Sequence, residues 1–319
     1  TSLRALRPAF PILLGASLML TLSIGIRQSL GIFMQPLTRD IGISISEFTV
    51  AIAIQNLAWG FTQPIAGAYA ARYGFRPVVL IGAGLFIAGL VLMAASQGFL
   101  SIMIGAGVLI GTSLSCIASS VSMAVAARSV PTSSRSLVLG IVSAAGSLGA
   151  LIAAPLGQAL NQEYGWRIGI AGFIILSLAL IPATWFAGKV DKLPLPPAPS
   201  NDIDGVSAKA VIGRALGNVS FIVMTMAYFV CGMQLVFLTT HLPTYLAICG
   251  MDPMLSAQTL GVIGGFNVIG SLFFGWAGGR WNKLALLGGI YFSRSLILGW
   301  YFMQVPTATT TLIFAALMG

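Results

Sequence analysis

The first long apolar segment of the chain reads Phe10-Pro-Ile-Leu-Leu-Gly-Ala-Ser-Leu-Met-Leu-Thr-Leu-Ser-Ile-Gly-Ile-Arg-Gln-Ser-Leu-Gly-Ile-Phe-Met-Gln-Pro36. It is long enough to cross a bilayer, because a spanning helix needs about 20 apolar residues. Similar segments recur along the whole sequence, which has 319 residues and is 57% hydrophobic but only 7% charged. Soluble domains carry about 25% charged residues. The composition therefore predicts an all-α protein that crosses a membrane many times.

One charged side chain, Arg27, lies well inside this first segment. An arginine at bilayer depth costs roughly 3 kcal/mol or more, so it persists where it faces a bundle interior, a water-filled cavity or a counter-ion. All seven acidic residues fall in loops or at the ends of predicted helices. Arg27, like Arg294 in a later segment, therefore has no carboxylate partner within the predicted spans.

The apolar runs between charged or turn-forming breaks predict nine complete spans, at residues 10–37, 48–70, 77–97, 100–127, 135–160, 168–188, 218–248, 256–278 and 284–303. A tenth run begins near Ala308 and reaches Gly319 after 12 residues, which is too short to cross. We therefore expect the sequence to stop inside a tenth helix.

The basic residues predict the orientation of these spans. Twelve of the sixteen lie in connections on one side, whereas only Arg39 and Arg167 lie in connections on the other. Since Lys and Arg collect in cytoplasmic loops, we expect a cytoplasmic N-terminus and a multi-pass protein of the cell (inner) membrane. The basic residues are scattered singly at segment ends, which argues against nucleic-acid binding.

The long connection at 189–217 separates six spans from those that follow, and its four prolines favour extended backbone without a packed core. We expect a six-helix bundle over 1–188, a cytoplasmic linker over 189–217 and an incomplete second bundle over 218–319. A repeat supports this division, since Gly67 to Tyr73 and Gly275 to Trp281 both read Gly-x4-Arg-aromatic. Such a same-sense repeat after six helices predicts parallel halves.

The connection after the second span reads Gly67-Ala-Tyr-Ala-Ala-Arg72-Tyr-Gly74-Phe-Arg76-Pro. With the six helices and the linker, it resembles the major facilitator superfamily, whose signature between helices two and three is Gly-x3-Asp-Arg-x-Gly-Arg-Arg. Ala71 replaces the Asp of that signature, so the role of that Asp cannot be carried over. We read the glycine as permitting close helix approach and the arginines, with Arg280 in the repeat, as braces of one end state. The alternative for each arginine is a positive-inside anchor.

Further phrases resemble the branch that holds oxalate:formate antiporters and monocarboxylate transporters: Gly25-Ile-Arg-Gln28-Ser-Leu-Gly-Ile-Phe33, Ala53-Ile-Gln55-Asn56-Leu-Ala-Trp59-Gly60, Gly165-Trp-Arg167 and Thr239-Thr-His241-Leu-Pro243. The resemblance implies a monomer of two parallel six-helix bundles that moves a small organic anion, a monocarboxylate, by alternating access. Antiport and facilitated exchange both stay open. The resemblance also implies that helices 1, 4, 7 and 10 line the cavity. The sequence offers no metal-ligand cluster, and we expect no cofactor or metal.

Arg27 is the strongest candidate for binding the substrate, because the guanidinium fork is planar and bidentate toward carboxylates. The alternative is that it bonds carbonyls or amides of a neighbouring helix. Arg294 is a second candidate, although a ninth helix is usually peripheral. Costly intramembrane amides add further candidates: Gln28, Gln55, Asn56, Gln63, Gln234 and Asn267. Because Gln55 and Asn56 are adjacent and point in different directions, at most one faces the cavity.

Other functions are less well supported by the sequence. His241 is the only histidine, and histidine is the residue type most often used for proton transfer near physiological pH, so it is the candidate for proton coupling, with packing before Pro243 as the alternative. Efflux of drug-like or uncharged molecules remains an alternative within transport. A membrane enzyme or sensor is a distant one, since no convergent catalytic set can be assembled. No phosphate-loop motif for ATP-driven transport is present.

Overall fold

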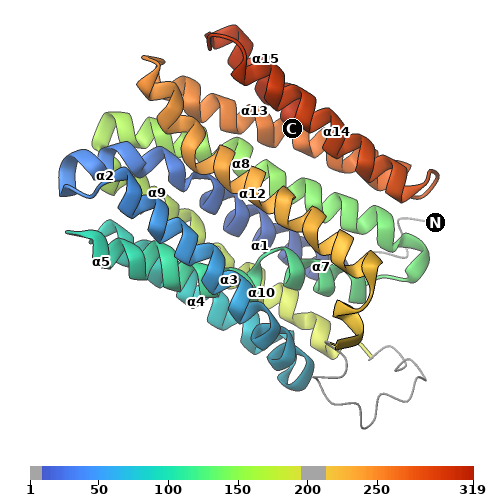
Figure 1. Cartoon of the computed structure of the whole chain (residues 1–319). Helices are drawn as coiled ribbons and strands as arrows, with labels where there is room; N and C mark the ends of the chain where they lie inside the picture. The colour runs from blue at the N-terminus through green and yellow to red at the C-terminus, as the bar shows by residue number, and fades with distance from the viewer. Residues whose placement is uncertain (1–8, 195–212) are drawn as a thin grey trace.

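The computed structural model describes residues 9–194 and 213–319, and within these ranges it contains helices and no strands (Figure 1). Each predicted span corresponds to a helical segment. Eight segments of the described residues are long and apolar enough to cross a membrane. The segment for the second span, α3 (Ile45–Tyr73), is as long but carries more polar side chains. The fold class predicted from composition is confirmed.

The first group of helices contains α1 (Phe10–Ser29), η2 (Leu30–Phe33), α2 (Met34–Ile41), α3, α4 (Phe75–Ala94), α5 (Phe99–Ile102), η3 (Met103–Leu109), α6 (Ile110–Ile117), α7 (Ser119–Arg128), η4 (Thr132–Ser134), α8 (Arg135–Tyr164), α9 (Trp166–Ser177), α10 (Leu180–Ala187) and η5 (Gly188–Lys192). The second group contains α12 (Val219–Ile248), α13 (Pro253–Ala277), α14 (Lys283–Phe302) and α15 (Ala308–Met318). Most of the predicted linker, 195–212, lies outside the described residues.

Local sequence features determine where individual helices begin and end. Ser44 caps α3 in a capping box with Glu47, and Gly74 follows its last residue with a φ of +90° that favours glycine. The fourth span contains a π-helical stretch, η3, where glycines allow close contact. A Cβ at Gly105 would lie 2.8 Å from the carbonyl oxygen of Gly89, and one at Gly107 would lie 3.0 Å from that of Ala51. These positions fix η3 against α4 and α3.

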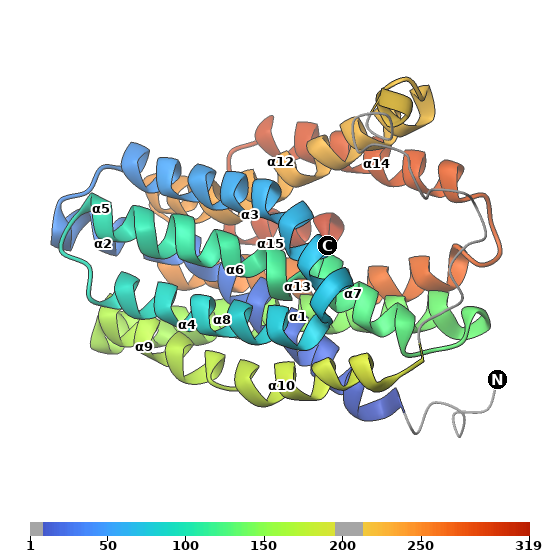
Figure 2. The ribbon, with the colours of Figure 1, turned by 90° about the horizontal axis from the view of Figure 1, so that it is seen from below.

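The two groups pack along α8 and α13, which lie side by side. A Cβ at Gly264 would lie 2.8 Å from the backbone of Leu151, so glycine is needed for this approach. We call the end of the bundle that holds α2 the α2 end, and the opposite end the η5 end. Toward the η5 end, α12 diverges from α1 (Figure 2), and its side chains there are largely exposed, Tyr228 at 74%.

At the α2 end, α12 returns to the first group. The backbone of Thr239 touches Gly31, where no Cβ would fit. The Thr244 hydroxyl donates to the Met34 sulfur at 3.2 Å. The two groups are therefore closed on each other at the α2 end and separate beside α12 at the η5 end.

Candidate functional site

Arg27 lies in the interior of the first group, with 7% of its surface exposed. Its Nη2 donates to Asn56 Oδ1 on α3 at 2.7 Å, and its guanidinium carbon lies 5.1 Å from the centre of the Trp59 ring. The buried Nε has no hydrogen-bond partner among the described residues. Both contacts are with neutral groups, so the charge of this cation is not balanced by them.

The neighbours of Arg27 on α3 are themselves held in place. Asn56 Nδ2 donates to the carbonyl of Ile52 at 2.7 Å, and the Trp59 indole N–H donates to Gln63 Oε1 at 3.0 Å. Gln63 in turn donates to the carbonyl of Ser115 on α6 at 3.3 Å. This chain of contacts fixes the amide and the ring that face Arg27.

The other predicted substrate residues do not all join this site. Gln55 is 1% exposed and donates to the carbonyl of Ala106 at 2.6 Å, so it ties α3 to η3 and points away from Arg27. Arg294 donates to the carbonyl of Met318 at 3.1 Å. Arg294 and Asn267 line a wide, mostly apolar cavity of about 990 Å³ between α13, α14 and α15.

Three further candidates are half-buried. Gln28 follows Arg27 on α1, and the ring of His241 packs 5.6 Å from that of Phe237. Gln234 on α12 has a buried Oε1 without a partner in the described structure. The predicted set therefore divides into an Arg27–Asn56 pair, an Arg294–Asn267 pair and separate amides.

The loop after α3 is organised by a residue that the sequence did not single out. Asp191 of η5 accepts from the backbone N–H groups of Phe75 and Arg76, both at 2.8 Å, at the first turn of α4. It also fills the space at Gly74, where a Cβ would lie 2.7 Å from its Oδ2. A carboxylate at a helix N-terminus is stabilising, so Asp191 fixes this loop to the end of the first group.

The glycine and the arginines of the loop motif differ in the contacts that they make. Gly67 is exposed, and a Cβ there would meet nothing within 4 Å among the described residues, so the close approach expected at this glycine stays a prediction. Arg72 is exposed and lies over Tyr73, with its guanidinium carbon 5.3 Å from the ring centre. Arg76 lies 3.6 Å over the Trp185 ring of α10. It braces α4 against α10.

The repeat of this motif begins in the last turn of α13 and continues into the turn that follows the helix. A Cβ at Gly275 would lie 3.4 Å from the Cα of Gly140 on α8, and Ser136 Oγ donates to the Gly275 carbonyl at 3.4 Å. Arg280 is exposed and lies over the Trp276 ring at 4.5 Å. Gly275 therefore faces α8 at an ordinary contact distance, whereas Arg280, in the turn after α13, contacts Trp276 of that helix.

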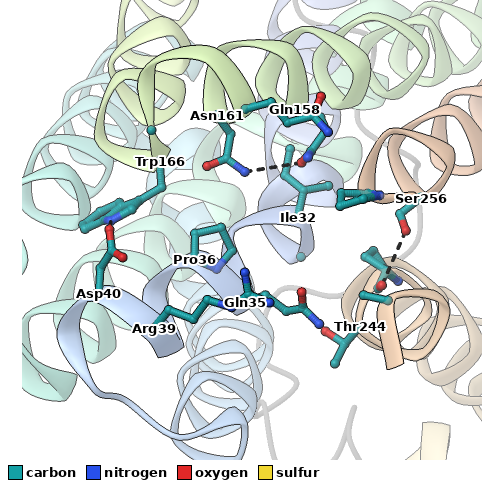
Figure 3. Close-up of a pocket in the computed structure, with 16 residues that line it drawn as sticks. Ile32, Gln35, Pro36, Arg39, Asp40, Gln158, Asn161, Trp166, Thr244 and Ser256 are labelled. Carbon is teal, nitrogen blue, oxygen red and sulfur yellow. Dashed lines mark hydrogen bonds between the residues drawn. The ribbon is translucent and has the colours of Figure 1, made fainter. Parts of the chain in front are cut away.

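A separate polar cavity of about 330 Å³ lies at the α2 end, between the two groups (Figure 3). Its polar walls come from α2 and α8, and Thr244 of α12 and Ser256 of α13 close the opposite side. The Trp166 indole N–H donates to Asp40 at 2.7 Å at one edge. Its polar lining residues are Gln35, Arg39, Asp40, Gln158, Asn161, Gln162, Trp166, Thr244 and Ser256.

A family model described as Major Facilitator Superfamily matches residues 14–319. The chain belongs to the Major Facilitator Superfamily. Its structure is similar to that of a D-xylose-proton symporter, with a TM-score of 0.63 at 16% identity over 97% of this chain and 79% of the symporter. At that identity the likeness shows the superfamily fold alone.

The chain is also similar in sequence to monocarboxylate transporter 3 of Rattus norvegicus, at 28% identity over 51% of this chain and 33% of that protein. It is also similar to monocarboxylate transporter 4 of Gallus gallus, at 32% identity over 53% and 35%. The matched segment thus spans about a third of these relatives. MFS-type transporter 1 of Ophiocordyceps sp. (strain BCC 1869) is 23% identical over 98% of this chain and 68% of that protein.

Within this superfamily frame, sequence reasoning named Asn56 and Gln63 as separate candidates but did not join them with Trp59 into one site, and it missed Asp191. Asn56, Trp59 and Gln63 recur at spacings of three and four, which places them on one helix face. That signal was available. Asp191 gave no such signal, because its partners lie 116 and 115 residues away. The cavity at the α2 end is lined by residues of six helical segments, η2, α2, α8, α9, α12 and α13, so no local sequence pattern predicted it.

Proposed function

We propose that this member of the superfamily carries a small organic anion, a monocarboxylate, across the membrane by alternating access, with Arg27 as the counter-charge of the substrate. One observation supports the proposal above the others. The Arg27 guanidinium is buried, its contacts are neutral, and its Nε lacks a partner among the described residues. An uncompensated buried cation is costly, and a substrate carboxylate would reduce that cost.

The surroundings of Arg27 suit an anion that binds and dissociates. Arg offers five N–H donors in a rigid fork, of which Asn56 occupies one. The Trp59 ring contacts the guanidinium without adding a negative charge, so it orients the cation and leaves its charge available. A carboxylate in the place of Asn56 would form a permanent ion pair, which would compete with a transported anion.

A second buried group lies at a similar depth on the facing helix. Gly31 of η2 touches Thr239 of α12, and the two helices run in the same direction (Figure 1). Arg27 precedes Gly31 by four residues and Gln234 precedes Thr239 by five, which corresponds to roughly 6 and 7.5 Å along a helix. Gln234 also has an unpartnered buried atom. An amide can turn either its oxygen or its N–H2 group to a ligand, so we propose that it contacts the same anion.

Similarity supports the substrate class. Several relatives carry the name monocarboxylate transporter, at 28% and 32% identity over about half of this chain. Their matched segments include neither the whole of this chain nor most of their own length, so the physical argument from Arg27 carries the proposal. We further propose that α1–α10 and α12–α15 belong to two bundles that move against each other, and that one chain suffices.

We propose that the η5 end faces the cytoplasm of the cell (inner) membrane, since the basic connections gather there. Cysteines introduced singly at the exposed residues Gln97 and Lys192, in a variant whose native Cys116, Cys231 and Cys249 are replaced by serine, test this in intact cells with a membrane-impermeant maleimide. The orientation requires labelling of Gln97→Cys without permeabilisation and of Lys192→Cys only after it. Equal labelling of both in intact cells would refute the proposal.

Counterflow of radiolabelled anions tests the substrate class. The protein expressed from its full gene, in liposomes preloaded with formate, acetate, lactate or oxalate, should accumulate the same labelled anion. Arg27→Gln should abolish this exchange, and Arg294→Gln, the matched loss of an intramembrane arginine, should retain it. Exchange of uncharged solutes with none of the four anions would instead favour the efflux alternative and overturn the proposal.

A further inference from the structure

The cavity at the α2 end has the features of a binding site that the transport mechanism above does not use. Its volume of about 330 Å³ lies at the lower limit of the roughly 300–1,000 Å³ typical of ligand pockets, which favours a small ligand. Arg27 is not among its lining residues. Figure 3 shows Arg39 and Gln35 reaching from α2 across from Gln158 and Asn161 of α8.

The guanidinium of Arg39 in this cavity has donors left for a ligand, in contrast to that of Arg167 at the same end. Arg167 donates to the carbonyls of Ala94 at 2.7 Å and of Ser96 at 3.0 Å, so it closes the end of α4. Arg39 is exposed and makes no hydrogen bond to any described residue. The nearby carboxylate of Asp40 accepts from the Trp166 indole, at the edge of the cavity away from Thr244 and Ser256 (Figure 3).

The amides around Arg39 provide donors for a carboxylate. Gln158, Asn161 and Gln162 recur at spacings of three and four on α8, which places them on one face. Asn161 donates to Gln158 Oε1 at 3.4 Å, a long bond that leaves other donors of both amides unassigned. Gln35 lies on the facing wall. A guanidinium surrounded by amides matches a small carboxylate in charge and in hydrogen bonding.

We propose that this cavity is a second anion-binding site that holds a small carboxylate between the two groups of helices. It rests on the proposed function only in taking the same class of ligand. Because residues of the first group (Arg39, Gln158) and of the second (Thr244, Ser256) both line the cavity, separation of the groups at this end dismantles the site. An anion bound there stabilises the arrangement that is closed at the α2 end and slows its opening.

Equilibrium binding of radiolabelled formate, acetate, lactate and oxalate to the purified protein tests the site. We expect two classes of sites for at least one anion. Arg39→Gln should weaken one class about tenfold, as for loss of a charge-assisted hydrogen bond, and should leave the other unchanged. Arg27→Gln should do the reverse. Arg167→Gln, which removes the other arginine at this end, should retain both classes.

The outcomes separate this proposal from the proposed function. A single class of sites that Arg39→Gln leaves unchanged, or binding of none of the four anions, would overturn the second site. Loss of a class with Arg39→Gln but not with Arg27→Gln would support the second site and count against Arg27 as the substrate's counter-charge. Counterflow gives an independent readout. Because an anion bound at the second site slows opening, high anion concentrations at the α2 side should inhibit exchange by the wild type. This inhibition should disappear in Arg39→Gln. Inhibition that persists there unchanged would contradict the proposal.

Discussion

The two arginines inside apolar segments occupy very different surroundings. Arg27 is buried in the first group, held by a side-chain amide and an indole that are themselves hydrogen-bonded. Arg294 is half-buried on α14, bonds the backbone carbonyl of Met318 and lines a wide cavity. This partner is a backbone carbonyl, which every residue supplies, whereas the partners of Arg27 are specific side chains. The specific side-chain contacts of Arg27 are therefore the better evidence for a function.

The same contrast appears in helix packing. Gly25 on α1 meets the backbone of Gly149 on α8, where a Cβ would lie 2.7 Å from the carbonyl oxygen, whereas a Cβ at Gly289 on α14 would meet nothing within 4 Å. Close backbone contact holds the helix of Arg27 in one position. The helix of Arg294 lacks that constraint, so its arginine is less well placed for selective binding.

The largest expected change in stability comes from overpacking the contact between α1 and α8. Gly25→Ala should destabilise the protein by about 3 kcal/mol, at the upper end of the usual range for overpacking. Gly289→Ala should be neutral or stabilise by up to about 1 kcal/mol, since alanine favours helix. Thermal unfolding in detergent measures both. Equal melting temperatures for the two variants would remove the distinction between the regions.

A charge introduced beside Arg27 should sharpen the comparison. Asn56→Asp places a carboxylate 2.7 Å from the guanidinium, so it should raise the melting temperature and weaken anion binding by about 30-fold, equivalent to about 2 kcal/mol. Asn267→Asp near Arg294 provides the control and should leave binding unchanged. Anion affinity at wild-type level in Asn56→Asp would show that the charge of Arg27 is not used for binding.

The smallest effect concerns the aromatic contact. Trp59→Leu removes the ring under Arg27 and its bond to Gln63, and should cost about 1 kcal/mol of stability. Trp276→Leu removes the comparable ring beside the exposed Arg280 and should cost less than half of that. Chemical or thermal unfolding of both variants decides the point, and a larger loss in Trp276→Leu would contradict this ranking.

The sequence predicted the spans well because the thickness of the bilayer sets the length of the apolar runs. The predicted seventh span, 218–248, and α12, Val219–Ile248, differ by one residue. Interruptions such as η2 and η3 were not predicted, since they depend on contacts with other helices. The glycines of η3, for example, approach Gly89 and Ala51, which lie on different elements.

Individual site residues were predictable only where their chemistry is local. The cost of a charge inside hydrocarbon pointed to Arg27, and the divergence of Gln55 and Asn56 follows from helix geometry. The partner chosen by each amide could not be inferred, because it depends on which helix is adjacent. Gln55 bonds η3 and Asn56 bonds α1. The same reason hid Asp191, whose backbone partners lie on α4.

The most direct test of the account measures anion-dependent thermal stabilisation of the wild type and of variants at Arg27. Arg27→Lys, which replaces the fork with a point charge, should weaken affinity for the transported anion. Arg27→Gln should reduce it by about 30- to 4,000-fold, corresponding to about 2–5 kcal/mol for a buried charge pair. Arg294→Gln should bind as the wild type does. Wild-type affinity in Arg27→Gln, with only its unliganded melting temperature changed, would contradict the claim that Arg27 is the substrate's counter-charge.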